Sequence, residues 1–132
     1  MDAERLEEIA RRYGIRLLLM FGSAVSGPLH ARSDVDLAVW LDRSPLSLRG
    51  HADLLGELQK LYPDREVDLA VINRADPLFL KKITERCRLL HGSALDLAEL
   101  KIYAFKRYQD HRRYLALERA YVARALRGLA AP

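Results

Sequence analysis

The stretch Ile15-Arg16-Leu17-Leu18-Leu19-Met20-Phe21-Gly22-Ser23, followed after ten residues by Asp34-Val35-Asp36, decides how this chain folds. Its first seven residues form a nearly continuous apolar run that ends at a glycine, which predicts a short buried strand rather than a helix. Residues 22–33 have the composition of a loop, with one helical turn expected after Ser23. A second strand is predicted over 34–41, polar at its start and apolar toward its end.

Helices and strands alternate on both sides of this pair. Hydrophobic spacing, caps and prolines predict helices over 2–13, 46–62, 76–86 and 93 to about 129, and further strands over 66–72 and 87–90. This alternation predicts an α/β (α+β) fold, in which a small mixed β-sheet is flanked by helices and followed by a long C-terminal helix.

Length and composition point to one domain. The 132 residues, half of them hydrophobic, suffice for one core, so we expect a single domain over 1–132 with a core over about 1–92 and a helical arm over about 93–129. Cys87 is the single cysteine and the first twelve residues are charged, which indicates a reducing cytoplasm. The apolar runs are far shorter than the roughly 20 residues that span a bilayer, so no membrane association is expected.

The net charge of +4 is concentrated in the last helix. Lysine and arginine balance aspartate and glutamate at fourteen each through Ala94, whereas the remainder carries eight basic and four acidic residues. Basic residues interleaved with aromatics can bind RNA, but an imperfect apolar seam favours packing on the domain or on a partner, in a homo- or hetero-oligomer. Nucleic acid is therefore not expected as the primary partner. The seam consists of Leu100, Tyr103, Tyr114, Leu117 and Tyr121.

Asp34 and Asp36 constrain the chemistry most strongly. Alternate residues of a strand project from one face, so these carboxylates stand side by side and repel each other unless a cation lies between them. Mg²⁺ is the expected cation because it prefers carboxylate oxygens and bridges to phosphates. Asp68 can supply a third ligand, because it lies in a second copy of the sequence Val-Asp-Leu-Ala-Val, and two such strands can be neighbours with Asp36 and Asp68 side by side on one face. Glu66, which shares the face of Asp68, remains the alternative.

Gly22 and Ser23 narrow the reaction class. A glycine directly after a strand lets the backbone approach a ligand, and the amides of a following helical turn favour phosphate oxygens. Arg32 is either a contact to phosphate or acceptor or an exposed loop residue, and Ser33 is either a turn residue or a support for an aspartate. His30 has no second ligand at a spacing that suits zinc.

These pieces together resemble a known signature. Phe21-Gly22-Ser23, ten residues, then Asp34-Val35-Asp36 resembles the Gly-Ser-x10-Asp-x-Asp motif of the DNA polymerase β nucleotidyltransferase superfamily. Within it, the small size, Ala24-x-x-Gly27 and the Arg32-Ser33 pair resemble the minimal nucleotidyltransferases (MNT), the MntA-like antitoxins of HEPN/MNT toxin-antitoxin systems. The likeness in motifs covers about residues 15–72.

The resemblance implies a role for each matching position. Asp34 and Asp36 would ligate two Mg²⁺ ions, and Asp68 would ligate the catalytic ion and help to deprotonate the attacking hydroxyl. Gly22 and Ser23 would hold the β- and γ-phosphates of ATP, with Arg32 and Ser33 as further nucleotide contacts. The acceptor would be a tyrosine of a partner HEPN toxin, which receives AMP while pyrophosphate leaves. Two alternatives stay open: a small-molecule, aminoglycoside-type adenylyltransferase, and a non-catalytic module that neutralises its partner by binding.

Overall fold

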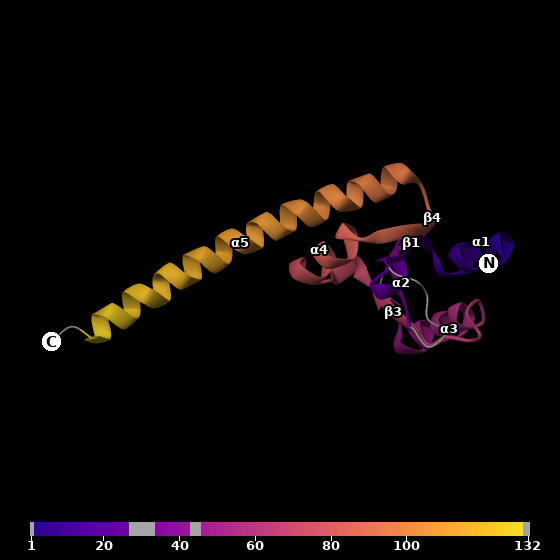
Figure 1. Cartoon of the computed structure of the whole chain (residues 1–132), viewed down its shortest axis with the longest axis horizontal. Coiled ribbons are helices and arrows are strands. Elements are labelled where there is room, and N and C mark those ends of the chain that lie inside the picture. The colour runs from indigo at the N-terminus through magenta and orange to yellow at the C-terminus, as the bar shows by residue number, and fades with distance from the viewer. Residues whose placement is uncertain (1, 27–33, 43–45, 131–132) are drawn as a thin grey trace.

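The computed structural model describes residues 2–26, 34–42 and 46–130 of the chain, and Figure 1 shows their arrangement. Each helix and strand predicted from the sequence is present, and one short 3-10 turn, η1, was not predicted. The elements are α1 (Ala3–Tyr13), β1 (Ile15–Phe21), α2 (Ser23–Ser26), β2 (Val35–Leu41), α3 (Leu48–Gln59), β3 (Val67–Val71), η1 (Ile72–Arg74), α4 (Pro77–Glu85), β4 (Cys87–His91) and α5 (Ala94–Ala130).

The four strands form one mixed sheet in the order β3-β2-β1-β4. β1 is antiparallel to both β2 and β4, whereas β2 and β3 run parallel. β1 and β2 are central, which explains their nearly continuous apolar sequences, because a strand covered on both faces needs apolar side chains on both. The predicted small mixed sheet is confirmed.

Helices cover both faces of the sheet. Alternation along β2 sends Val35, Leu37 and Val39 into a core with α1 and α3, whereas Ala38 faces a second core with α4 and the start of α5. Asp36 lies between Val35 and Leu37 in sequence, so it projects to the same side as Ala38. The acidic side chain therefore faces the side of the sheet that α4 covers.

Both ends of α3 lie inside the predicted range of 46–62, because side chains cap the helix there. The hydroxyl of Ser47 accepts a hydrogen bond from the Gly50 amide at 3.0 Å, so α3 begins at Leu48 rather than at residue 46. The helix ends at Gln59, whose side-chain amide donates to the carbonyls of Tyr62 and Arg65 beyond the helix.

The ends of β2 and β3 are joined by another side chain. Asn73, in η1, accepts from the amide of Leu41 at 2.9 Å and donates to its carbonyl at 2.8 Å. These two bonds attach η1 to the end of β2, so the chain leaves the sheet after Val71 and not after residue 72.

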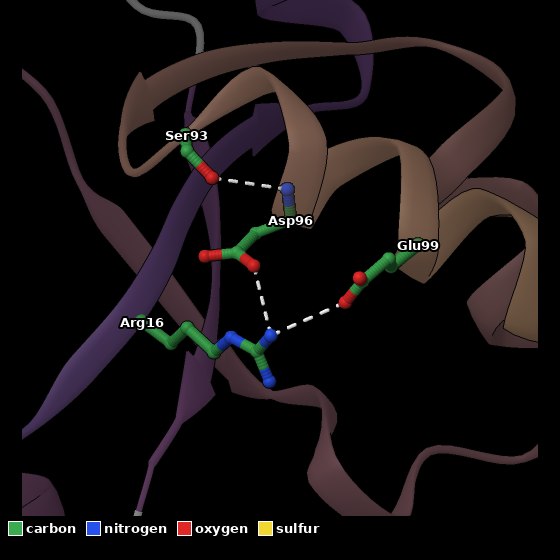
Figure 2. A network of polar contacts seen from close by, with 4 residues as sticks. All are labelled: Arg16, Ser93, Asp96 and Glu99. Atoms are coloured by element: carbon green, nitrogen blue, oxygen red, sulfur yellow. Dashed lines mark hydrogen bonds and ion pairs between the residues drawn. The ribbon is translucent and has the colours of Figure 1, made fainter.

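The start of α5 is fixed to the sheet by the ion pairs in Figure 2. Ser93 caps the helix by accepting a hydrogen bond from the Asp96 amide at 3.0 Å. Arg16 of β1 donates to Asp96 at 2.8 Å and to Glu99 at 3.2 Å, and its guanidinium lies 4.5 Å from the centre of the Trp40 ring. One arginine thus connects β1, β2 and the first two turns of α5.

α5 stays on the domain as far as Tyr108, whose ring contacts Lys81 of α4, and beyond α4 it leaves the domain, as Figure 1 shows. Leu100 is buried in the core beneath the helix, but Tyr114, Leu117 and Tyr121 are 62%, 71% and 74% exposed and Tyr103 is 45% exposed. Of the seam predicted to pack on the domain or on a partner, Leu100 packs on the domain, and packing of the exposed members on a partner stays a prediction. A straight helix outruns the small sheet, so helical periodicity alone does not bring its distal residues to a covering surface. No helix in the described ranges is long and apolar enough to cross a membrane.

Candidate active site

Two of the predicted acidic residues meet where β2 and β3 begin. Asp36 and Asp68 are direct partners in the parallel register of the two strands, so their side chains share one face. Asp34 precedes β2 by one residue and lies two positions before Asp36, exposed to solvent. The expected adjacency of Asp36 and Asp68 is confirmed. Glu66 lies one residue before β3, so Asp68 and not Glu66 is opposite Asp36.

The carboxylates influence one another. Burial raises the pKa of Asp36 above its usual value, and the nearby charges of Asp68 and Asp34 raise that pKa further. Lys82 of α4 acts in the opposite direction, because its positive charge favours the ionised carboxylate. The fold thus holds like charges together at a cost, and a bound cation would offset that cost.

Gly22 brings the turn after β1 against Asp36. Its φ of +79° lies in the left-handed region that favours glycine, and a Cβ at this position would lie 2.4 Å from Oδ2 of Asp36. The Val25 amide donates to the Gly22 carbonyl at 3.2 Å, which starts the single turn of α2 at the exposed Ser23. Conformation and space both require glycine here, and they place the Gly22-Ser23 backbone beside the acidic pair.

An open pocket of about 740 Å³ contains this region. It is lined by Gly22, Ser23 and Asp36, by Lys82 and Glu85 of α4, and by Arg86, the residue directly after that helix. Lys82, Glu85 and Arg86 were not predicted from the sequence. Their spacing on the helix that follows the Asp68 strand was the available signal, but such a polar helix face resembles an ordinary solvated surface.

The donor chemistry of Asp34, Asp36 and Asp68 fits Mg²⁺, and of these three Asp36 lines the pocket. Asp36 and Asp68 offer adjacent carboxylate oxygens, with Asp34 close enough to act on the pKa of Asp36, and Mg²⁺ completes such a set with water and phosphate oxygens. Three or more histidine, cysteine, aspartate or glutamate side chains do not converge on one point anywhere in the described residues. A complete set therefore needs oxygens from the substrate or from water. Arg32, Ser33 and His30 lie outside the described residues.

Solved structures with the same fold include several toxin-antitoxin proteins. One chain, from the crystal structure of a toxin-antitoxin with AMP-PNP, is 22% identical with a TM-score of 0.72, and the match covers 96% of this chain and 98% of that chain. Another comes from tri-AMPylated Shewanella oneidensis HEPN toxin in complex with MNT antitoxin, at 20% identity, a TM-score of 0.65 and 94% coverage of both chains. At these identities the likeness establishes the fold alone.

A small-molecule enzyme also shares the core. Spectinomycin adenyltransferase AAD(9) from Enterococcus faecialis, solved with ATP and spectinomycin, is 16% identical with a TM-score of 0.53. The match covers 74% of this chain but 57% of that enzyme. No curated protein sequence matches the chain.

The family itself is established by sequence. Residues 4–95 match the sequence model described as "Polymerase beta, Nucleotidyltransferase". That range contains the sheet, the Gly22 turn and all three aspartates of the candidate site. The chain therefore belongs to the polymerase beta nucleotidyltransferase family.

Proposed function

We propose that this nucleotidyltransferase is an antitoxin that transfers AMP from ATP to a tyrosine hydroxyl of a HEPN toxin, with Mg²⁺ as cofactor. The observation that carries the proposal is the in-register pair Asp36 and Asp68 beside the Gly22 turn, which combines a cation site with a phosphate site. The AMP-PNP and the tri-AMPylated toxin in the structures of related fold support ATP as donor and a protein as acceptor.

Each residue of the site has a role in this reaction. Asp34, Asp36 and Asp68 would hold Mg²⁺, which when bound stabilises negative charge on the attacking and leaving oxygens. The backbone of Gly22 and Ser23 would hold the β- and γ-phosphates, and Arg32 and Ser33 are proposed as further nucleotide contacts. Lys82 and Arg86, across the pocket, would add positive charge against the same anionic tail.

The transfer would follow an in-line displacement. The tyrosine oxygen forms a bond to the α-phosphorus as the bond from that phosphorus to the bridging oxygen breaks, and pyrophosphate leaves with the electron pair. The phenolic proton passes to the carboxylate of Asp68. The chain's contribution is mainly positioning and electrostatic stabilisation, as is usual for phosphoryl-group chemistry.

Coverage favours a protein acceptor over a small one. The match extends over 94% or more of the antitoxin chains, whereas it leaves 43% of spectinomycin adenyltransferase unmatched. The pocket is open, and in the described part of the chain no second domain encloses an acceptor. The single cysteine fits the reducing cytoplasm where we propose that the protein acts.

Label transfer tests this proposal. Wild-type protein, α-³²P-ATP, Mg²⁺ and the HEPN-family protein encoded beside its gene should yield a labelled toxin, and Asp34→Ala combined with Asp36→Ala should abolish the label. Asp53→Ala is the matched control, because Asp53 is exposed on α3, across the sheet from the pocket. A stable complex that never becomes labelled, and whose neutralising effect survives the double substitution, would establish the binding-module alternative instead. Label on aminoglycosides but not on the toxin would establish the small-molecule alternative.

A further inference from the structure

A second, smaller hollow lies between α4 and α5. This α4–α5 groove has a volume of about 200 Å³. Its walls combine two aromatic rings with the side chains of three charged residues and one threonine. The lining residues are Lys81, Thr84, Glu85, Lys101, Phe105 and Tyr108.

Phe105 is the exposed apolar residue of the groove. It is 62% exposed, although its neighbour Ala104 is 2% exposed beneath the same helix. Tyr108, one turn further along, is held between cations, with Lys81 at 4.7 Å and Arg112 at 6.0 Å from the ring centre. The fold thus presents one fixed ring and one uncovered ring side by side, which suits the insertion of a large apolar side chain.

The groove adjoins the active-site pocket. Glu85 lines both, with Lys81 and Thr84 on the groove side of α4 and Lys82 and Arg86 on the pocket side. A polypeptide seated in the groove would therefore lie next to the pocket that Asp36 lines, on the other side of Glu85.

The charge of the groove and the pocket indicates what kind of segment they accept. Lys81 and Lys101 lie in the groove and Lys82 and Arg86 lie in the pocket, while Glu85 is the acid between them. Glu85 is paired with Lys81, so the charges of these two residues cancel, and Lys101, Lys82 and Arg86 supply the net positive charge. An acidic segment is complementary to this surface, whereas a basic segment is not.

We propose that the α4–α5 groove is the docking site of the protein acceptor. An acidic segment of the acceptor inserts a leucine or aromatic side chain between Phe105 and Tyr108, and this anchor leads a nearby tyrosine past Glu85 to the aspartates. The inference rests on the proposed function, which it deepens by naming where the acceptor is held and what chemistry it presents.

The test compares two aromatic residues of α5 with equal exposure. Phe105 and Tyr114 are both 62% exposed, but nine residues of helix place them on opposite faces. The affinity of the neighbouring HEPN-family protein is measured by calorimetry for the wild type and for Phe105→Glu, Lys101→Glu, Phe105→Leu and Tyr114→Glu. AMP-PNP affinity in Mg²⁺ is measured for each, and thermal melting checks that each variant is folded.

Phe105→Glu should weaken acceptor binding by roughly 30-fold, the size of a hot-spot loss. Lys101→Glu should weaken it by roughly 10-fold, while Phe105→Leu and Tyr114→Glu stay within about 2-fold of the wild type. AMP-PNP affinity should not change in any variant. Unchanged acceptor binding in Phe105→Glu, an equal loss in Tyr114→Glu, or a wild type that binds no acceptor would each overturn the proposal.

The calorimetric test stays informative if the proposed function fails. A wild type that binds the HEPN-family protein without transferring AMP would refute the transfer reaction. The five affinities would still show whether that protein docks in the α4–α5 groove. Conversely, efficient labelling that is indifferent to Phe105→Glu would retain the reaction and refute the groove.

Discussion

The sequence Val-Asp-Leu-Ala-Val occurs twice, in β2 at 35–39 and in β3 at 67–71, and the two copies have different environments. In β2 the four apolar residues are 0% exposed, because a strand lies on either side and helices cover both faces. In β3, at the edge of the sheet, only Val67 is fully buried and Asp68 is exposed. Identical pentapeptides thus become a core strand and a rim strand through their neighbours alone.

Because of this difference, the two aspartates have different surroundings and are expected to contribute differently to the site. Asp36 is partly buried, touches the Gly22 turn and has a raised pKa, so it is the fixed centre of the site. Asp68 reaches the same place from an edge strand, whose start is held by backbone contacts and by Gln59. We therefore expect substitutions in the two copies to differ in size, and four comparisons test this.

The largest expected effect is on AMP transfer. Asp36→Asn should lower the rate by roughly 10³-fold and Asp68→Asn by roughly 10²-fold, because each removes a carboxylate that would hold Mg²⁺, the cation that stabilises negative charge in the transition state. Single-turnover rates with saturating Mg²⁺ and ATP measure both. A larger loss in Asp68→Asn would show that the edge strand carries the principal ligand.

The leucines of the two copies should differ in their effect on stability. Leu37→Ala should lower the free energy of unfolding by about 2–5 kcal/mol, since its side chain is 0% exposed and its loss leaves a cavity. Leu69→Ala, at a partly buried edge position, should lower it by about 1 kcal/mol. Urea denaturation of both variants gives the comparison, and equal losses would contradict the difference in environment.

Gln59 should stabilise the start of β3 without affecting the pairing of β2 with β1. Its side chain accepts a hydrogen bond from the Val67 amide at 3.0 Å and donates to the carbonyls of Tyr62 and Arg65. Gln59→Leu removes all three bonds, including the one to the Val67 amide, and should lower the free energy of unfolding by about 1–3 kcal/mol. Hydrogen exchange should accelerate at Val67 while the amides of β1 opposite β2 stay protected. Gln59→Glu, which keeps the acceptor oxygen for Val67, should lose less protection at that amide.

The smallest expected effect is on how the melting temperature depends on pH, measured on the protein without Mg²⁺ or nucleotide. Because the pKa of Asp36 is raised on folding, its ionisation destabilises the folded state above that pKa, and the penalty vanishes below the unfolded value of about 3.9. Asp36→Asn, which mimics the neutral acid, should therefore raise the melting temperature at pH 7 and lose this advantage as the pH falls toward 4. Asp53→Asn on α3 serves as the control. A pH-independent gain would mean that ionisation of Asp36 is not its cause.

Local pattern was sufficient for some parts of the molecule and not for others. The run before Gly22 predicted β1, and the repeated pentapeptide predicted that Asp36 and Asp68 are neighbours, because strand periodicity fixes which side chains share a face. The place of Lys82 and Arg86 at the pocket was not predicted from the sequence, because only the packing of α4 shows which side of it meets the pocket. The division of the α5 seam between the domain and a partner could not be predicted for a related reason: periodicity groups residues on one face but does not say what covers that face.

The order of strands in the sheet also has a kinetic consequence. β1 and β2 are joined by the short connection 22–34, whereas β1 meets β4 only after most of the domain has intervened. The entropy cost of loop closure rises with loop length. Pairing β1 with β2 therefore costs the unfolded chain less entropy than pairing β1 with β4. The β1–β2 hairpin contains Gly22, Ser23, Asp34 and Asp36, so the first segment expected to assemble is the one that carries the nucleotide chemistry. Selection for rapid folding and selection for catalysis would then act on the same stretch of chain.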